Sequence, residues 1–499
     1  MQKARLRKIA SASLGAMMAV SALAGCGSSG GSASTSSNAA NTEATAASTV
    51  STESSTASVT EAAAAAATED VKSAYPDLTG KTVTMMAWWS GGEQEAGQAK
   101  VDLCEKELGV TIDANYIPYD EYLSKLNTLS AAGQMPDVFA LPEGNVYQWA
   151  SEGQVMDLAP AYKDAGIDLD KTYIPQVLFR QGEHVWGVGY DIASLFLYYN
   201  KDLFDAAGVE YPSSDASNPW TWDQYVDAAK KLTKDMNGKT PNDDGFDYDN
   251  VATYGTLMPT SWVKFVPLLH TNGTGILNDD GTALGFTSPE GIEVFQSIAD
   301  LSLKEKCAPT AAIAQSAFSD ASTMLMNGQV AMQIDGSWAM SSYVNEGFDI
   351  GVAAVPMFKE PGDIAWCCGF CVNPNTKDTE AALAVHRWFT DFSNYIDACD
   401  QAGLGLGGLP QSYSVYNSED YIAKWKKLHS EAMVETAQSV FNESTTVLGD
   451  NVTVKNFPQI ADDVLVPALD NVWSGDETAE TAVNSIKDKA SSYVDGFWN

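Results

Sequence analysis

The most constraining feature of this 499-residue sequence is the stretch at residues 186–204, WGVGYDIASLFLYYNKDLF. Its apolar run at residues 195–199 is typical of a strand buried on both faces, and a buried helix is the alternative that periodicity leaves open. Residues 202–208 then have the pattern of a short helix that ends at Gly208. Because a chain of this length exceeds the size at which a single core stops growing, we predict two lobes, with this stretch as the strand that crosses between them.

The first 25 residues have the pattern of an export signal. Four positive charges precede a short apolar run at residues 9–20, and Leu-Ala-Gly-Cys follows, ending at Cys26. This apolar run is too short for a membrane-spanning helix. The small residues before Cys26 resemble a bacterial lipobox, which implies a signal peptide at residues 1–25 and a lipid on Cys26. A buried N-terminal helix is the alternative.

Residues 26–76 are predicted to be a disordered tether. Most of this segment consists of Ser, Ala, Thr and Gly with scattered Glu, a composition that buries too little apolar surface to become ordered. A flexible chain of this length reaches on average about 35 to 40 Å. We therefore expect a folded domain held at a distance from a membrane by its lipid.

Charge and hydropathy exclude several classes of protein. The net charge of −36 becomes −40 when the four positive charges of residues 1–25 are removed. This acidity argues against nucleic acid as a partner, because phosphate binding requires clustered Lys or Arg. No later segment offers about 18 consecutive apolar residues, so we expect membrane attachment only through the lipid.

The six cysteines after Cys26 are expected to be small buried residues rather than a metal site. Cys368 and Cys371 form a Cys-x-x-Cys pair, but the sequence has no second such pair, and its four histidines are scattered. No metal and no cofactor are predicted. The disulfide state is left open for all six: Cys104, Cys307, Cys367, Cys368, Cys371 and Cys399.

The acid-rich segment at residues 241–250, PNDDGFDYDN, is interpreted as a solvated loop. An EF-hand loop would need a different acid spacing and a Glu at its twelfth position, where counting from Asp243 gives Tyr254. Whether the acids of residues 243–249 bind a cation is left open.

Strand and helix patterns alternate from residue 81 onward. A strand pattern ends at Trp88, a second covers residues 110–116, and a third covers residues 135–140. Alternation with short connections predicts an α/β fold with mainly parallel sheets flanked by helices. Because ligands bind beyond the C-terminal ends of such strands, the loops at residues 88–92 and 141–145 are the first candidate binding segments.

A similar arrangement recurs later in the chain. Residues 330–334 have a strand pattern that ends in Asp335-Gly336-Ser337-Trp338. A strand, a tight glycine turn and a new helix start would place free backbone amides and an indole at one sheet edge, which suits a neutral polar ligand. The glycine-rich residues 403–410 lack the strand and helix context of a phosphate loop, so nucleotide binding is not expected.

Four segments in this order resemble an extracellular solute-binding protein of the ABC-importer family that includes maltose- and oligosaccharide-binding proteins. They are YIPYDEYLSKLNTLSAAGQMPDVFAL, WGVGYDIASLFLYYNKDLFDAAGVEYP with the following WTWDQYVDAAKKLT, FTSPEGIEVFQSIADL, and NGQVAMQIDGSWAM. The resemblance covers about residues 80–495. It implies a two-lobed, type II periplasmic-binding-protein-like fold with hinge crossings.

The resemblance also implies lobe boundaries and a function. The first lobe would comprise residues 77–190 and 369–410, and the second residues 191–368 and 411–499. We expect crossings near residues 189–194, 366–370 and 409–412. The protein would be a lipid-anchored receptor on the outer face of a bacterial cell membrane that captures a carbohydrate between its lobes. It would deliver this ligand, a mono- or oligosaccharide, to the permease of an ABC transporter, and it would not be an enzyme.

Aromatic candidates for the binding site follow from the chemistry of sugars, whose apolar ring faces stack on Trp or Tyr. Trp338 matches a stacking position of the resembled family, and it lies, like Trp88, just beyond a predicted strand end. Alternation along the strand would send either Trp88 or Trp89 into the lobe. The full set of candidate platforms is Trp88, Trp89, Trp262, Trp338 and Trp366.

Polar candidates would bind sugar hydroxyls once water is excluded. Glu143 and Asn145 lie at the offset after a strand where sugar binders place such groups. Asp191 occupies the first crossing, where many relatives carry an Asp, and Gln411 follows the glycine-rich turn. Asp335 joins them from the Asp-Gly-Ser-Trp segment.

Two alternative functions come from other classes. A secreted glycoside hydrolase also combines aromatic platforms with acids, and it needs two carboxylates about 5 to 10 Å apart across the scissile bond. The other alternative is a sensory or adhesive carbohydrate-binding lipoprotein with the same fold. The identity of the sugar, its chain length and a non-sugar solute are left open.

Overall fold

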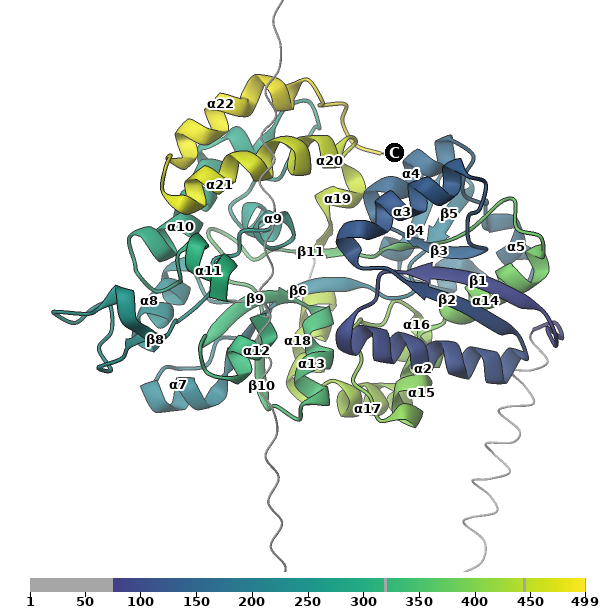
Figure 1. The fold of residues 1–499 in the computed structure, drawn as a ribbon, viewed down its shortest axis with the longest axis horizontal. Helices are drawn as coiled ribbons and strands as arrows, with labels where there is room; N and C mark the ends of the chain where they lie inside the picture. Colours follow the sequence, from purple (N-terminus) through teal and green to yellow (C-terminus); the bar gives the residue numbers. More distant parts are fainter. Residues whose placement is uncertain (1–74, 318–320, 443–445, 499) are drawn as a thin grey trace, which may run out of the picture. The chain divides into compact units, whose positions relative to one another are not determined.

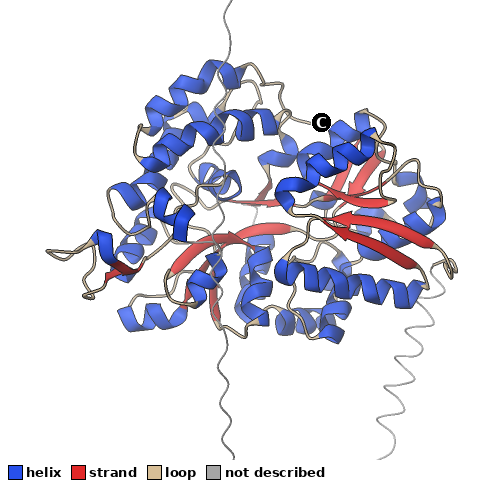
Figure 2. Cartoon of the chain, in the orientation of Figure 1, coloured by secondary structure: helices blue, strands red, loops and turns tan. Residues whose placement is uncertain are grey.

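The computed structural model describes residues 75–317, 321–442 and 446–498. The predicted signal peptide, the lipidated Cys26 and almost all of the predicted tether therefore lie outside the described residues. Two β-sheets with helices packed on them organise the described chain, together with a small two-stranded hairpin (Figures 1 and 2). We call the first sheet with its helices the first lobe, and the second sheet with its helices the second lobe.

The first sheet has six strands in the order β2-β1-β3-β12-β5-β4. Parallel pairing is confined to β1 with its two neighbours, β2 and β3. The hairpin strands β4 and β5 are antiparallel, and β12 runs antiparallel to both β3 and β5. In chain order the strands are β1 (Thr82–Ala87), β2 (Thr111–Tyr116), β3 (Val138–Leu141), β4 (Leu178–Gln181), β5 (His184–Val188) and β12 (Gly369–Val372).

The second sheet is built around β6 (Ala193–Asn200), which pairs antiparallel with three strands. Every residue of β6 after Ala193 is buried, which explains the uninterrupted apolar run in the sequence. Its partners are β9 (Met332–Gly336), β10 (Ile350–Ala353) and β11 (Asp363–Trp366), and β13 (Thr446–Leu448) pairs parallel with β11. Both lobes are thus α/β, as predicted, but their pairing is mixed rather than mainly parallel.

The helices of the first lobe pack on the first sheet and on one another (Figure 1). Helix α2 begins after Ser90 and ends at a left-handed Gly109, and helix α4 begins directly at Glu143. The helices are α2 (Gly91–Leu108), α3 (Tyr119–Ala131), α4 (Glu143–Ser151), α5 (Ala159–Asp164), α6 (Leu169–Thr172), η1 (Pro175–Val177), α14 (Thr379–Phe389), α15 (Phe392–Ala402), α16 (Tyr413–Tyr416) and α17 (Glu419–Leu428).

Local sequence signals set several helix ends of the second lobe. Thr221 and Gln224 form the predicted capping box at the start of α8, and Gly208 ends α7 in the left-handed conformation. The helices are α7 (Lys201–Ala207), α8 (Trp222–Leu232), η2 (Tyr248–Asn250), α9 (Trp262–Thr271), η3 (Gly285–Thr287), α10 (Pro289–Leu303), α11 (Ala311–Ala317), α12 (Ala321–Met326), η4 (Ser337–Ala339), α13 (Met340–Asn345), α18 (Glu431–Asn442), α19 (Asp450–Thr453), α20 (Phe457–Ile460), η5 (Ala461–Leu465), α21 (Val466–Ser474) and α22 (Ala479–Ser491).

Two segments pass directly between the two sheets, and a third, around Leu409, joins α15 to α16 next to them. Residues 189–192 connect β5 to β6, and residues 367–368 connect β11 to β12. The third segment lies beside the first, because Ile192 and Leu409 exchange two backbone hydrogen bonds of 3.1 and 3.0 Å. Gly189 is required here, since a Cβ at this position would approach Cys367 to 2.8 Å. The predicted crossings at residues 189–194 and 366–370 include the first two segments, whereas residues 409–412 connect α15 to α16.

Helices α16 and α17 differ from the expected division of the chain at residue 411. They pack against α15, and α16 also contacts α6, so both lie with helices of the first lobe. Polar contacts explain the docking of α17: the Lys424 ammonium and the Tyr421 hydroxyl donate to Asp397 on α15, at 2.5 and 3.1 Å. Both helices thus belong with the first lobe instead of the second.

The six described cysteines are buried and unpaired.

The acidic loop lies in the small hairpin of β7 (Lys234–Asp235) and β8 (Val251–Thr253), and its polar groups form hydrogen bonds with one another. The Asp235 carboxylate accepts backbone N–H groups of the loop, and the Lys239 ammonium donates to the carbonyl oxygens of Asp244 and Gly245 at 2.7 and 3.3 Å. Within the described ranges there is no group of three or more His, Cys, Asp and Glu side chains that could hold a metal ion.

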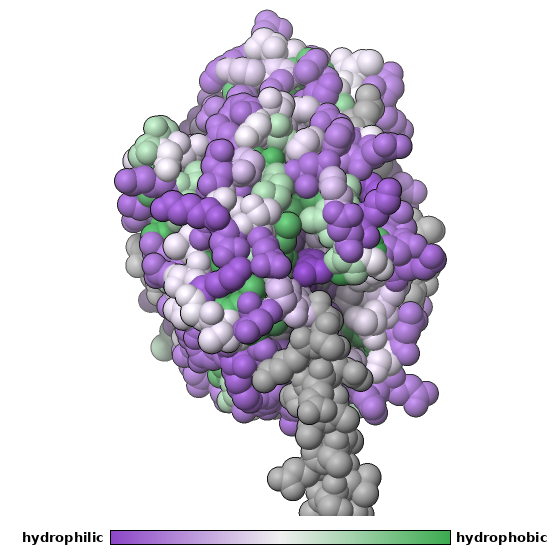
Figure 3. All heavy atoms as spheres, turned by 90° about the vertical axis from the view of Figure 1, so that its right-hand side faces the viewer, coloured by the Kyte–Doolittle hydropathy of each residue, from purple (hydrophilic) through white to green (hydrophobic). Residues whose placement is uncertain are grey.

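The surface of the first lobe in Figure 3 is mostly hydrophilic, with small apolar patches between polar side chains. Large hydrophobic residues with an exposed side chain are few among the described residues: Tyr119, Tyr211 and Met236. None of the helices described is both long enough and apolar enough to cross a membrane.

Candidate ligand-binding site

A pocket of about 410 Å³ lies where the crossings meet the ends of both sheets. The crossings form part of its lining through residues 190–192, 367–368 and 407–408. Side chains from both lobes supply the rest. The lining residues are Trp88, Ser90, Glu93, Tyr119, Glu143, Tyr190, Asp191, Ile192, Ala193, Trp262, Val263, Ser337, Trp338, Trp366, Cys367, Cys368, Gly407 and Gly408.

The second lobe contributes three indole rings. Trp262 is the first residue of α9, Trp338 lies in the short η4 turn after β9, and Trp366 is the last residue of β11. The rings of Trp338 and Trp366 meet edge to face, with centroids 5.8 Å apart. Gly336 allows this arrangement, because a Cβ there would come within 2.2 Å of the Trp338 ring.

The first lobe contributes Trp88, which follows β1, and Tyr119, which begins α3. Their rings are perpendicular, with centroids 5.5 Å apart, and the Trp88 ring also contacts the buried Tyr122 at 4.9 Å. Tyr119 is 56% exposed, whereas Trp88 is half-buried. Trp88 is therefore held in place by packing and still presents part of its ring to the pocket.

Three carboxyl groups line the same pocket. Glu143 begins α4 and is 8% exposed, and it accepts a hydrogen bond from the side-chain amide of Asn451 on α19. Burial raises the pKa of Glu143 to about 7. Burial, together with the nearby charge of Asp191, raises the pKa of Glu93 to about 8. Burial also raises the pKa of Asp191, although attraction to Lys100 opposes the rise.

Lys100 lies behind Asp191, inside the first lobe. It is 1% exposed, and its ammonium is enclosed by the rings of Tyr190, Phe389 and Tyr395, at 5.1, 5.1 and 4.8 Å from their centroids. Within the described structure this ammonium has no hydrogen-bond partner. Burial lowers the pKa of Lys100, and the carboxylate of Asp191 opposes that fall. The Lys100 ammonium and the Asp191 carboxylate therefore each stabilise the ionised form of the other.

Six of the ten side chains predicted from sequence line this pocket: Trp88, Glu143, Asp191, Trp262, Trp338 and Trp366. Trp89 does not line it, because alternation sends its ring into the first lobe. There the Trp89 ring lies parallel to Phe389, with centroids 6.5 Å apart, and its N–H donates to the Tyr190 hydroxyl at 3.0 Å.

The other three predicted residues also lie outside the pocket lining. Gln411 is fully buried, and its amide donates to the carbonyl oxygens of Gly189 and Thr390 at 3.2 and 2.6 Å. Asp335 is paired with Lys264 at 3.2 Å. Asn145 lies in the first turn of α4, because this helix begins at Glu143, inside the loop predicted at residues 141–145.

Sequence reasoning missed several lining residues, of which Glu93 matters most. It lies in the first turn of α2, just beyond the loop at residues 88–92 that was predicted to border the site. The Ser-x-x-Glu pattern at residues 90–93 would have indicated a helix start there. Tyr119, Tyr190 and Ser337 had no comparable local signal.

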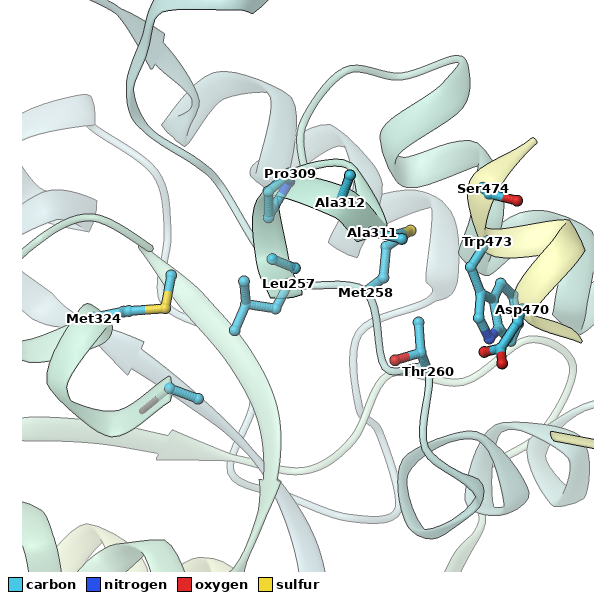
Figure 4. Close-up of a pocket in the computed structure, with 12 residues that line it drawn as sticks. Leu257, Met258, Thr260, Pro309, Ala311, Ala312, Met324, Asp470, Trp473 and Ser474 are labelled. Atoms are coloured by element: carbon cyan, nitrogen blue, oxygen red, sulfur yellow. The ribbon is translucent and has the colours of Figure 1, made fainter. Parts of the chain in front are cut away.

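A second cavity, of about 630 Å³, lies entirely within the second lobe and shares no residue with the pocket between the sheets. Figure 4 shows that its wall consists largely of small and aliphatic side chains such as Leu257, Met258 and Pro309. Trp473 on α21 borders it, but this residue is only 4% exposed and packs on Phe295. This cavity therefore lacks the converging aromatic and carboxyl groups of the first.

The architecture and the site together define a class of protein: a two-lobed α/β binding protein with a pocket at the crossings between its lobes. The family of bacterial extracellular solute-binding proteins has a model that matches residues 99–429, which is more than half of the chain. The chain belongs to this family.

Relatives and solved structures agree with this assignment. An sn-glycerol-3-phosphate-binding periplasmic protein of Brucella melitensis is 24% identical over 427 residues, covering 81% of this chain and 92% of the relative. An ABC substrate-binding protein from Listeria monocytogenes, solved in complex with cycloalternan, has a TM-score of 0.70 at 25% identity and covers 83% of this chain and 98% of its own. A maltose/maltodextrin-binding domain from Bdellovibrio bacteriovorus bound to maltotriose has a TM-score of 0.66 at 20% identity, covering 82% and 99%. These neighbours confirm the two-lobed periplasmic-binding-protein fold.

Proposed function

We propose that the protein captures a carbohydrate in the pocket between its lobes and delivers it to the permease of an ABC importer. The observation that carries this proposal is the convergence of four Trp rings and three carboxyl groups on one pocket of about 410 Å³ at the crossings. Solved neighbours named for cycloalternan and maltotriose support the sugar class of the ligand.

The residue types of the pocket suit both surfaces of a sugar. A pyranose ring has apolar faces, which stack favourably on Trp88, Trp338 or Trp366. Its hydroxyls need partners once water is excluded, and the carboxyl groups of Glu93, Glu143 and Asp191 are strong acceptors. The buried Ser337 hydroxyl has no hydrogen-bond partner in the described part of the chain, so it is available to a ligand hydroxyl.

Ligand capture would act through a population shift between open and closed lobes. A sugar that contacts both walls stabilises the closed state by its differential affinity for that state. Contacts between the lobes already favour closure without ligand. Asn345 on α13 accepts a hydrogen bond from the Gly405 amide at 2.8 Å, and the side-chain amide of Asn451 donates a hydrogen bond to the carboxylate of Glu143. The sugar would add to these contacts.

We also propose that the mature protein begins at a lipidated Cys26 and is held on the outer face of the cell membrane by residues 26–76. The lobe boundaries would be residues 77–190 and 369–410 for the first lobe and residues 191–368 and 411–499 for the second, with α16 and α17 moved to the first lobe because of their contacts with α15. Fractionation tests the anchor: Cys26→Ser should shift the protein from membranes to the medium. Membrane retention of Cys26→Ser would overturn the anchor.

A melting-temperature screen against a panel of mono- and oligosaccharides tests sugar capture. A ligand at about one hundred times its dissociation constant stabilises the folded protein by roughly 2.7 kcal/mol, which shifts the melting temperature measurably. We expect at least one saccharide to produce a saturable shift. A flat response to the whole panel would contradict the proposal.

We propose further that the protein binds its ligand without converting it. Family members are substrate-binding proteins. The competing function is glycoside hydrolysis, which the raised pKa values of Glu93 and Glu143 favour, since a hydrolase needs a carboxylic acid protonated near neutral pH. Incubation with labelled oligosaccharides decides between them. Turnover by catalytic amounts of protein, lost in Glu143→Gln, would establish the enzyme.

A further inference from the structure

The charged side chains that line the pocket all have the same sign. Glu93, Glu143 and Asp191 are acidic, and among the described residues no Arg, Lys or His lines the pocket. The cations nearest to it are already engaged or enclosed. Lys264, on the first turn of α9, is paired with Asp335 at 3.2 Å, and Lys100 lies behind Asp191 within a shell of aromatic rings. Neither ammonium lines the pocket.

The helix N-termini at the pocket do not take the place of these cations in attracting an anion. Helices α2 and α4 begin at the pocket, and a helix N-terminus ordinarily attracts anions. Helix α9 also begins at the pocket and has no acid in its first turn, but its Lys264 is already paired with Asp335. In α2 and α4 the first turn already carries a carboxyl group of the protein, Glu93 in α2 and Glu143 in α4. An incoming anion would therefore meet these side chains before it reached the free amide groups.

Burial makes this arrangement selective. Glu143 is buried and Glu93 and Asp191 are half-buried, so like charges among them are less screened by water than at an open surface. The raised pKa values of Glu93 and Glu143 have the same origin, because these carboxyl groups lack nearby positive charge to offset the loss of water. An added anion would increase this imbalance, whereas hydroxyl and ammonium groups would reduce it.

We propose that this pocket excludes anionic solutes and takes carbohydrates that present only hydroxyl or ammonium groups. The inference rests on the proposed capture of a carbohydrate at this pocket. It separates the protein from relatives of the same family named for sn-glycerol 3-phosphate, whose ligand carries a phosphate. Asp191 supplies negative charge at neutral pH, and Glu93 adds to it above its pKa of about 8, so the charge preference is measured at pH 9, where Glu93 is ionised.

Thiol chemistry measures the charge preference without knowledge of the ligand. Ser90 lines the pocket, is exposed, and makes no side-chain capping bond, so Ser90→Cys places a reactive thiol there. Its reaction rates with a trimethylammonium-ethyl and a sulfonato-ethyl methanethiosulfonate are compared. The matched control is Ser124→Cys, an exposed position on α3 of the same lobe that does not line the pocket. The six described cysteines are buried, and the unsubstituted protein provides the background of all native cysteines.

The cationic reagent should be favoured at residue 90 over residue 124 by about tenfold, the lower end of the range by which a cleft of one charge concentrates counter-ions. Adding Glu93→Gln should reduce that preference several-fold, and Asp191→Asn provides a second test at the crossing. Equal preferences at residues 90 and 124 would overturn the proposal. So would a preference at residue 90 that neither substitution changes, because it would then come from the overall charge of the protein.

A ligand titration completes the test. sn-Glycerol 3-phosphate should leave the melting temperature unchanged up to millimolar concentrations, relative to sodium sulfate at the same ionic strength. A saturable shift with sn-glycerol 3-phosphate would overturn anion exclusion. The outcomes separate the two proposals. If no sugar in the panel shifts the melting temperature but the charge preference is present, only carbohydrate capture is overturned. If a sugar does shift the melting temperature but the charge preference is absent, only anion exclusion is overturned.

Discussion

The two walls of the pocket differ in their chemistry. The wall from the second lobe presents Trp262, Trp338 and Trp366 with one serine and no charged side chain. The wall from the first lobe presents Glu93 and Glu143 beside Trp88 and Tyr119, and Asp191 stands on the crossing that leads from it. The first lobe thus supplies charge and hydrogen-bond acceptors, and the second supplies flat apolar surfaces.

This difference suggests how the two lobes share the work of binding. Carboxyl groups fix the orientation of a ligand through directional hydrogen bonds, whereas indole rings contribute area that becomes favourable only when water is expelled. We expect a ligand to be oriented first by the acidic wall and then to be covered by the aromatic wall as the lobes close. Each wall can be altered separately, because its residues come from different elements.

Removal of the central ring of the aromatic wall should have the largest effect. Trp338→Ala should weaken binding of the best saccharide from the panel by about 30- to 100-fold, as expected for a desolvated Trp at the centre of an interface. The ligand-free protein should remain folded, since Trp338 is only half-buried. Titration calorimetry measures the affinity. Trp186→Ala, at a half-buried Trp outside the pocket, is the matched control and should change affinity less than about twofold. Equal losses of stability and affinity in Trp338→Ala would instead make Trp338 a core residue.

The acidic wall should be next in importance. Asp191→Asn keeps the size of the side chain and removes its charge, and we expect about a tenfold loss of affinity, the value of a charge-assisted hydrogen bond. It should also lower the melting temperature of the ligand-free protein, because the Lys100 ammonium loses the carboxylate that sustains its charge. An unchanged affinity would show that the acidic wall does not bind the ligand.

Lys100 influences both ligand affinity and stability through the charge of Asp191. Lys100→Met removes the attraction that limits the pKa of Asp191, so this pKa should rise further and Asp191 should become protonated at a higher pH. Affinity should then fall at neutral pH and recover as pH increases. The free energy of unfolding should also fall, since removing one partner of a buried pair leaves the carboxylate of Asp191 uncompensated. Affinity measured from pH 5.5 to 8.5, in a Glu93→Gln background to remove a second titration, checks this. A parallel loss at every pH would exclude the electrostatic explanation.

The acidic wall should also make the ligand-free protein less stable as pH rises. The pKa of Glu93 is raised from its ordinary value of 4.5 to about 8, so the folded state keeps a proton that the unfolded state releases. The stabilisation is fully present below the unfolded pKa and is lost as pH rises through the folded pKa. Urea unfolding at pH 5 and pH 8 should show a smaller decrease in Glu93→Gln than in the unsubstituted protein. The same decrease in both would mean that Glu93 is not the group responsible.

The smallest effect is expected at Asn145. This residue was a candidate from sequence but lies on α4 outside the pocket lining. Asn145→Ala should change affinity by less than about twofold, as is usual for a substitution away from a binding site. A tenfold loss would show that the closed, ligand-bound pocket extends further along α4.

Sequence patterns predicted the fold more completely than the site. Strands, helix ends and crossings are local features: the buried run of β6, the capping box at Thr221 and the glycine that ends α7 all appear in short windows. Trp338 and Trp88 were found because each follows a strand directly. The choice between Trp88 and Trp89 was not available from sequence, since it depends on which face of the first sheet is covered by helices.

Gln411 and Asp335 show why polar candidates are the least predictable. Gln411 lies near the predicted crossing at residues 409–412 and Asp335 near the end of β9, yet Gln411 donates to the carbonyl oxygens of Gly189 and Thr390, and Asp335 pairs with Lys264. A buried polar side chain takes whichever partner the packing offers, and that partner can be distant in sequence. Glu93 was missed for the related reason that its role depends on Asp191, which lies far along the chain.

The amino-acid sequence was sufficient for the α/β class and for the aromatic character of the candidate site, because periodic burial, caps and strand ends are set by neighbouring residues. Only the tertiary structure decided that Glu93, Glu143 and Asp191 converge without a lining cation, and that Lys100 stands behind them. These groups come from α2, α4 and a crossing. Their mutual distances, and hence their charges, follow from how the lobes pack together.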